Sequence, residues 1–162
     1  MSISIRDARP ADRALIFALV GELAEYEKLA AEVDASEEHI AAVLFGPQPR
    51  VFCDIAEWNG EPAGLALWFL NFSSFRGRHG IYLEDLFVRP ALRGRGIGKA
   101  LMRQLARRCV ERGFARFEWT VLDWNTPSID FYRSIGANIL GDWRVCRMSG
   151  DALRQFAGER AR

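Results

Sequence analysis

Seven residues, Arg93 to Lys99, form a glycine-rich turn that constrains the fold more than any other feature of the sequence. They read Arg-Gly-Arg-Gly-Ile-Gly-Lys and lie between a predicted strand, Ile81 to Val88, and a predicted amphipathic helix, Gly96 to Arg112. Glycine allows a tight turn and the close approach of a ligand to the backbone. The free N–H groups and the dipole at a helix start favour an anion such as phosphate. The turn therefore predicts an anion site on a strand–turn–helix unit.

Two common phosphate-binding turns do not fit this segment. A P-loop needs Ser or Thr after Gly-Lys, whereas Ala100 follows Gly98-Lys99, and Arg93 stands where the first glycine is required. A dinucleotide-binding turn needs GxGxxG early in the chain, whereas the spacing here is GxGxG and the turn comes late. The turn on its own leaves open a purely structural role.

Periodicity and turn residues predict a mixed α/β (α+β) domain over residues 1–162, with a substantial antiparallel part. Asn59-Gly60 is a strong signal for a tight hairpin. The predicted strands are Ser2 to Ala8, Val51 to Trp58, about Pro62 to Leu70, Ile81 to Val88, Arg116 to Leu122 and Trp143 to Met148. The predicted helices are Pro10 to Tyr26, Ser36 to Gly46, Gly96 to Arg112, Thr126 to about Gly136, and a short one at the C-terminus.

Charge is segregated along the chain although the total is nearly balanced, with 22 basic and 21 acidic residues and a net charge of +1. Glu22 to Glu38 is strongly acidic, and Arg89 to Arg116 is strongly basic. Both runs fit solvated helix faces; they equally fit a basic site for a polyanionic cofactor and an acidic approach for a cationic substrate. The balanced total disfavours a nucleic-acid binder.

The apolar stretches and the cysteines argue against a membrane protein, a secreted protein and a metal-binding protein. No stretch approaches the roughly 20 apolar residues of a membrane span, and the N-terminus lacks the pattern of a signal peptide. The three cysteines are far apart and form no cluster with histidine, so we expect reduced thiols and no metal site. We expect a cytoplasmic protein that binds neither membrane nor nucleic acid.

A second motif lies downstream, Asn125-Thr126-Pro127-Ser128-Ile129-Asp130-Phe131-Tyr132. It resembles the Asn-x-x-(Ala/Ser)-x-x-x-Tyr run of the GNAT N-acetyltransferase superfamily, and Arg93-x-x-Gly96-x-Gly98 resembles that family's (Gln/Arg)-x-x-Gly-x-(Gly/Ala) motif. Gly80 to Val88 and Leu23 to Leu29 are similar to the spermidine/spermine (diamine) acetyltransferase group. The resemblance implies the GNAT fold, a mixed and mostly antiparallel central sheet flanked by helices. From the residues alone, Asn125 also fits a helix cap and Tyr132 a core aromatic.

The resemblance implies an acetyl-CoA-dependent N-acetyltransferase that acts on a primary amine of a small molecule by direct transfer in a ternary complex. An alkylammonium has a pKa near 10.4, so the amine must lose a proton before it attacks a thioester. Glu84 matches the family's base, which acts through water, or else only binds the cation. Tyr132 matches the tyrosine that protonates the coenzyme A sulfur.

The same resemblance implies the cofactor-binding residues. Backbone groups near Leu86 and Val88 match the contacts to the acetyl carbonyl and pantetheine arm, and Asn125 matches a coenzyme-side asparagine. The residues that match the pyrophosphate loop are Arg93, Gly94, Arg95, Gly96, Gly98 and Lys99.

For the amine, the expected binding residues are Glu27, Arg76, Glu84 and Asp85. Polyamine enzymes of this group tend to carry Asp-Pro-Trp where this chain has Ser74-Phe75-Arg76, which favours a short diamine or a lysine-like amine over spermine. The group also implies a homodimer. Acetylation of a protein amine and a non-catalytic acyl-CoA sensor remain as alternatives.

Overall fold

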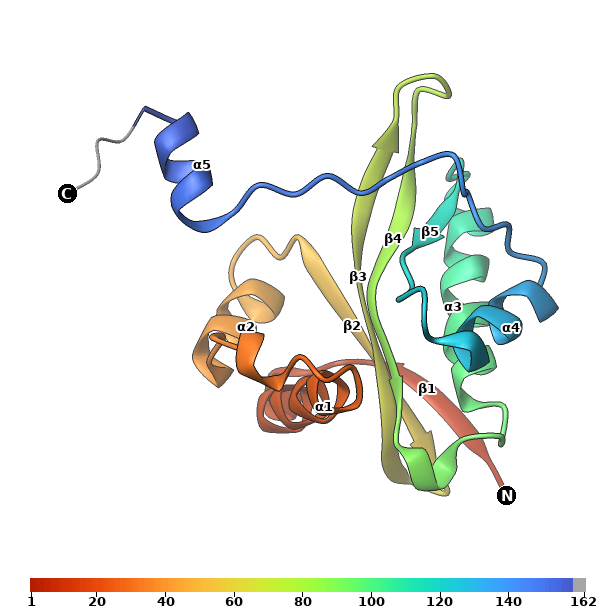
Figure 1. Cartoon of the computed structure of the whole chain (residues 1–162). Coiled ribbons are helices and arrows are strands. Elements are labelled where there is room, and N and C mark those ends of the chain that lie inside the picture. Colours follow the sequence, from red (N-terminus) through yellow and green to blue (C-terminus); the bar gives the residue numbers. More distant parts are fainter. Residues whose placement is uncertain (159–162) are drawn as a thin grey trace. The chain divides into compact units, whose positions relative to one another are not determined.

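A five-stranded sheet forms the centre of the first of two compact units (Figure 1). The computed structural model describes residues 1–158; the first unit is Met1–Thr120 and the second begins at Val121. The strands lie in chain order. The pairs β1–β2, β2–β3 and β3–β4 are antiparallel, and β5 is parallel to β4. Their bounds are β1 Ile3–Asp7, β2 Val51–Trp58, β3 Glu61–Ser73, β4 Arg78–Val88 and β5 Phe117–Trp119.

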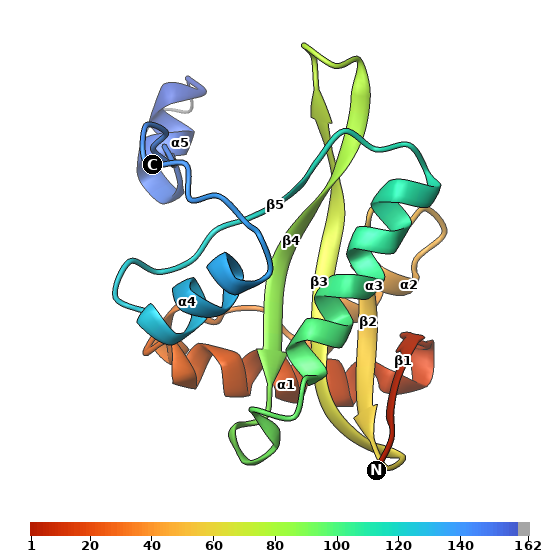
Figure 2. The same cartoon turned by 90° about the vertical axis from the view of Figure 1, so that its right-hand side faces the viewer.

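Helices cover both faces of this sheet. α1 and α2 lie on one face and α3 on the other (Figures 1 and 2). The helical bounds in this unit are η1 Pro10–Asp12, α1 Arg13–Tyr26, η2 Ala30–Glu32, α2 Glu37–Phe45, η3 Pro90–Leu92 and α3 Ile97–Glu111. The arrangement confirms the predicted mixed, mostly antiparallel sheet flanked by helices.

The core follows from one apolar stripe on each helix. In α1, Ile16, Leu19 and Leu23 are buried at the i, i+3, i+7 spacing of a helix face. They pack against Ile55, Leu65 and Phe87 of the sheet, among others. In α3 the buried stripe consists of Ile97, Leu101, Met102, Leu105 and Cys109. Burial of a side chain of this size contributes about 1.5–3 kcal/mol, so these stripes fix both helices on the sheet.

Local signals place several element ends as predicted. Asn59 and Gly60 both have positive φ and join β2 to β3 as a two-residue hairpin. Ser36 is the N-cap of α2, where its side chain accepts a hydrogen bond from the His39 backbone N–H. Gly113 follows the end of α3 with a φ of 64°.

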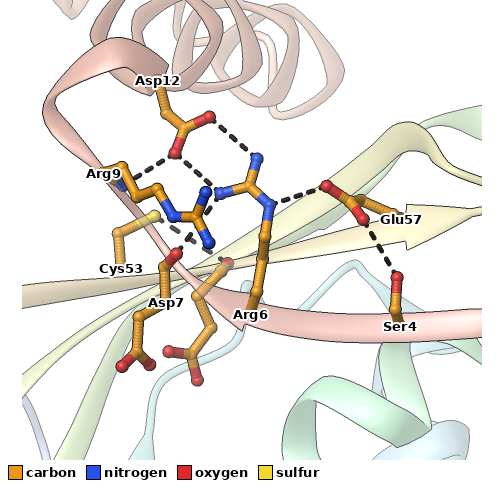
Figure 3. Close-up of polar contacts among 8 residues, drawn as sticks. Ser4, Arg6, Asp7, Arg9, Asp12, Cys53 and Glu57 are labelled. Carbon is orange, nitrogen blue, oxygen red and sulfur yellow. Dashed lines mark hydrogen bonds and ion pairs between the residues drawn. The ribbon is translucent and has the colours of Figure 1, made fainter.

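Arg6 ties the edge of the sheet to the start of α1 (Figure 3). Its guanidinium donates to both carboxylate oxygens of Asp12 at 2.8 and 2.9 Å and to Glu57 at 2.7 Å. Asp12 in turn accepts the Arg9 backbone N–H at 2.7 Å. The bonds to Arg6 hold the pKa of the Asp12 carboxyl below its usual value. The start of α1 is therefore held on β1 by these ion pairs and hydrogen bonds as well as by apolar packing.

The second unit contains α4 (Thr126–Ser134) and α5 (Gly150–Phe156). The strand predicted over Trp143 to Met148 is wrong: this segment has no regular structure, and none of the strands within residues 1–158 pairs with it. Its alternating apolar residues are exposed, Trp143 by 79% and Val145 by 73%, so the pattern has no buried face to stabilise a strand. Among residues 1–158, none of the helices combines the length and the hydropathy that a membrane span requires.

Candidate active site

The centre of the site is an irregularity in β4. Leu83 pairs with Trp68 and Asp85 with Leu67, two adjacent residues of β3, so Glu84 has no partner in that strand. This extra residue is a β-bulge, which bends a strand and redirects its side chains. The parallel pairing with β5 stops at Leu83. Among the described strands, none pairs with the other edge of β4 beyond that point, so its backbone is open to a ligand there.

A cavity of about 370 Å³ lies beside the bulge. Its walls come from the second half of α1, the segment that follows it, and β4. Four of the lining side chains are carboxylates, and no lysine or arginine lines it. The lining residues are Val20, Leu23, Ala24, Glu27, Leu29, Glu32, Val33, Glu84 and Asp85. We call this cavity the acidic pocket.

The acidic pocket perturbs two of its own carboxyl groups. Burial, with smaller contributions from the charges of Glu84 and Glu27, raises the pKa of Asp85 from 3.8 to about 6. Burial also raises the pKa of Glu27. A cation bound between these groups would favour their ionised forms and reverse part of both shifts. The negative charge of the acidic pocket therefore favours a positively charged ligand.

The turn after α1 sets which acids line the pocket. The Leu29 N–H bonds to the Ala24 carbonyl at 2.8 Å, and the Lys28 N–H bonds to the Glu25 carbonyl at 3.1 Å. This is the Schellman pattern, in which the residue after the helix end takes the left-handed conformation. Lys28 does so with a φ of 62°. The reversal brings Glu27, Leu29 and Glu32 to one pocket.

The glycine-rich turn follows β4 and the short helix η3. Gly94 and Gly96 have φ values of 74° and 84°, a conformation that costs other residues about 1–2 kcal/mol. Gly96 is the N-cap of α3 and has no side chain to bond the first N–H groups of the helix. Gly94, Gly96 and Lys99 are exposed. The turn therefore presents free N–H groups at an accessible helix start, as the sequence predicts.

The arginines of this turn have partners inside the first unit. The Arg93 Nε donates to the Val88 carbonyl at 2.9 Å, and its guanidinium lies 4.2 Å from the centre of the Tyr26 ring. The Arg95 guanidinium lies 5.2 Å from the centre of the Trp58 ring. The roles of both side chains toward a phosphate stay predictions.

Asn125 and Tyr132 belong to the second unit. Asn125 is the N-cap of α4, where its side-chain oxygen accepts the Ser128 N–H at 3.3 Å. Tyr132 lies six residues into that helix and is buried. A capping role for Asn125 is thus observed, while the expected roles of the two residues toward coenzyme A stay predictions.

Arg76 does not line the acidic pocket. It lies in the exposed turn between β3 and β4, at the opposite end of β4 from the glycine-rich turn (Figure 1). Arg78 opens β4 and precedes Asp85 by seven residues, which is about 23 Å at the usual strand rise of about 3.3 Å. Of the expected amine-binding residues, the structure brings together Glu27, Glu84 and Asp85, and not Arg76.

Sequence reasoning missed some of the pocket. Leu29, Glu32 and Val33 line it but were not singled out, although the acidic run Glu22 to Glu38 contains all three. The sequence does show that Glu22 to Glu38 is acidic. Which of these residues line the acidic pocket depends on the turn at Lys28, which the sequence does not show. Residues 1–158 contain no group of three or more His, Cys, Asp or Glu side chains that could hold a metal ion.

Comparison with known proteins gives consistent matches. The model of the acetyltransferase (GNAT) family matches residues 16–137. A thialysine N-epsilon-acetyltransferase of Sus scrofa is 38% identical over 98% of this chain and 99% of its own. The L-ornithine N5-acetyltransferase NATA1 of Arabidopsis thaliana is 31% identical over 93% of this chain and 86% of its own. The structure of an integron cassette protein from V. cholerae superposes with a TM-score of 0.80 and 28% identity, over 97% and 98% of the two chains.

Proposed function

Since the chain belongs to the acetyltransferase (GNAT) family, we propose that it acetylates a short diamine or a lysine-like amine with acetyl-CoA. It is an N-acetyltransferase for small-molecule amines, as its relatives are. The observation that supports the proposed substrate is the acidic pocket, in which four carboxylates surround about 370 Å³. At neutral pH an alkylamine is a cation, so this pocket attracts the amine group of either substrate.

Glu84 is the proposed proton acceptor for the bound ammonium. Its position in the bulge supports this role, because the irregular backbone turns its side chain toward the acidic pocket at the open edge of β4. The ammonium gives one proton to Glu84 through water, and the amine nitrogen then attacks the thioester carbon. Asp85 and Glu27 bind the charge that remains on a diamine.

The rest of the reaction concerns the carbonyl and the thiolate. Backbone N–H groups of β4 near Leu86 and Val88 are proposed to stabilise the oxygen as it becomes negative. The C–S bond then breaks, and Tyr132 gives its phenolic proton to the departing sulfur. The amine nitrogen gives up its second proton, through solvent, to the Tyr132 phenolate, which leaves a neutral amide and restores the phenol. Both substrates are present together in this direct transfer, so no acetyl group is attached to the protein.

Acetyl-CoA fits the glycine-rich turn as a co-substrate. Its pyrophosphate needs donors without a side chain in the way, which Gly94, Gly96 and Gly98 supply at the start of α3. Lys99 and Arg95 are exposed beside them and add positive charge. Asn125 is the proposed coenzyme-side residue of the second unit.

Release of free thiol on mixing the protein with acetyl-CoA and a panel of amines tests the proposal. The panel contains cadaverine, lysine, ornithine, spermidine, spermine and a lysine-containing peptide. Cadaverine or a lysine-like amine should give the highest kcat/KM. A preference for the peptide would support acetylation of a protein amine, and binding of acetyl-CoA without thiol release would support a sensor; either result overturns the proposal.

We also propose that the protein is a cytoplasmic homodimer. The exposed apolar side chains of the second unit, among them Trp143, Val145 and Phe156, support self-association because surfaces of this kind are commonly covered by a partner. Light scattering should give twice the mass of 18.3 kDa at micromolar concentration. A monomer mass throughout that range contradicts the dimer.

A further inference from the structure

Two arginines that flank η3 contact the last turns of α1. Arg89 forms a salt bridge with Glu22 at 2.9 Å and also donates to the Pro62 carbonyl at 3.1 Å. Arg93 places its guanidinium 4.2 Å from the centre of the Tyr26 ring. Glu22 and Tyr26 are four residues apart and so lie on the same face of the helix. The residues on either side of η3, Arg89 and Arg93, therefore contact the end of α1 at two successive helical turns.

The Arg93 guanidinium is held from several sides. Its Nε donates to the carbonyl of Val88, the last residue of β4, at 2.9 Å, and the Phe87 ring centre is 5.7 Å away. Tyr26 packs against the main hydrophobic core, so its ring offers a firm surface. A cation over an aromatic face is attracted by the ring's electron density, and the flat guanidinium also stacks on it. Lysine would provide the charge but not the stacking.

Tyr26 directly precedes Glu27, which lines the acidic pocket. Glu27 is the C-cap of α1, and its backbone N–H bonds to the Leu23 carbonyl at 2.9 Å, so its backbone moves with the last turn of the helix that carries Tyr26. A shift of the Tyr26 ring would therefore carry the Glu27 carboxylate away from Asp85. The contact with Arg93 restrains such a shift.

We propose, on the basis of the function above, that Arg93 is a positioning residue for the amine pocket. It stacks on Tyr26 and so holds Glu27 where the bound cation needs it. The motif resemblance instead implies that Arg93 serves the pyrophosphate. The two roles predict different results when the Arg93 side chain is removed: weaker binding of the amine in the first case, and weaker binding of coenzyme A in the second.

The test compares Arg93→Ala, Arg93→Lys, Tyr26→Leu and Tyr26→Phe with the wild type. Steady-state kinetics with cadaverine at saturating acetyl-CoA give the amine KM and kcat, and calorimetry gives the Kd of coenzyme A. Arg103→Ala is the control, because Arg103 is an exposed arginine that lies on α3, outside the glycine-rich turn. Thermal melting identifies any variant that does not fold.

Arg93→Ala, Arg93→Lys and Tyr26→Leu should each raise the amine KM about three- to tenfold and leave kcat and the Kd of coenzyme A within about twofold. The double variant Arg93→Ala/Tyr26→Leu should be no worse than either single one, because both remove the same contact. Tyr26→Phe keeps the ring and should lie closer to the wild type than Tyr26→Leu.

The proposal is overturned if Arg93→Ala weakens coenzyme A at least tenfold while Tyr26→Leu leaves the amine KM unchanged. It is also overturned if the two single effects add. If Tyr26→Leu fails to fold, Arg93→Lys decides: an unchanged amine KM overturns the proposal. A wild-type protein that acetylates none of the amines overturns the proposed function itself, and the inference then falls with it.

Discussion

The glycine-rich turn and the acidic pocket are the two proposed binding sites beside the second half of β4, and they are built by different means. The turn uses backbone: Gly94 and Gly96 adopt positive φ, and the start of α3 supplies N–H groups. The pocket uses side chains: carboxylates from α1, the following segment and β4 meet around one cavity. A site made of backbone depends on conformation and hardly on pH, whereas a site made of carboxylates depends on charge. The two regions should therefore respond to different perturbations.

The largest expected effect lies outside both regions. Tyr132→Phe should lower kcat about 10²–10⁴-fold, the usual contribution of a general acid, and leave the Kd of coenzyme A and the amine KM within about threefold. Tyr82→Phe is the matched control, because Tyr82 lies on β4 and its hydroxyl reaches Thr120 at 3.5 Å. A kcat within about twofold of the wild type would assign Tyr132 to packing, which its burial also permits.

Gly96→Glu should weaken the binding of coenzyme A at the glycine-rich turn and leave the acidic pocket unchanged. A side chain at a φ of 84° costs about 1–2 kcal/mol, and an acid at the helix start repels phosphate. We expect coenzyme A to bind about 100-fold more weakly by calorimetry. Gly21→Glu adds the same charge to α1 at a glycine with open space around it and should leave coenzyme A binding unchanged. Unchanged affinity in Gly96→Glu would mean that the turn is structural.

Asp85→Asn should weaken the recognition of the amine in the acidic pocket and leave the glycine-rich turn unchanged. Loss of a carboxylate beside the bound cation should lower kcat/KM for cadaverine about tenfold, which corresponds to about 1.4 kcal/mol. The same change should raise the Tm at pH 7.5 by several degrees, because the half-buried Asp85 is ionised there at a cost in stability. Glu25→Gln, an exposed acid of α1 that does not line the pocket, is the control for both measurements. A lower Tm would show that Asp85 is stabilising.

The pH dependence of amine binding should follow from the raised pKa of Asp85. Cadaverine stays a dication below pH 8, while Asp85, with a pKa of about 6, is protonated at pH 5 and ionised at pH 8. The Kd of cadaverine, measured by calorimetry with coenzyme A present, should therefore fall about fivefold from pH 5 to pH 8. The effect on stability has the opposite sign: in the free protein, stability falls as pH rises from about 4 to 6, because the native state binds the proton more tightly than the unfolded state. Asp85→Asn should flatten both profiles, and a profile that keeps its inflection would exclude Asp85.

The same contrast explains how much the sequence could predict. The turn is local, so its glycines, the preceding strand and the helix from Ile97 to Glu111 are readable from spacing alone. Glu84 and Asp85 followed from resemblance, but the bulge that turns them to one pocket exists only in the register between β3 and β4. The reversal at Lys28 is carried by a residue type that rarely adopts positive φ, so no sequence signal marked it. Apolar and polar residues alternate from Trp143 to Met148 as they do in a strand. A strand also needs a neighbouring strand to pair with, and the alternation does not show whether one is present.

The smallest expected effect concerns Arg76, which the sequence associated with the amine. The structure places it in the turn before Arg78, and Arg78 itself is about 23 Å along β4 from Asp85. Charges are screened over about 8 Å at physiological ionic strength, so an exposed arginine at that distance contributes little to the pocket. Arg76→Asp should therefore change the ratio of kcat/KM for cadaverine to that for spermine by less than twofold at 0.15 M salt. Glu84→Gln, measured in parallel, should lower both values about 10²-fold or more, because Glu84 lines the pocket and is the proposed proton acceptor. A change of fivefold or more for Arg76→Asp would mean that this side chain reaches the bound amine after all, and the argument from distance along β4 would then fail.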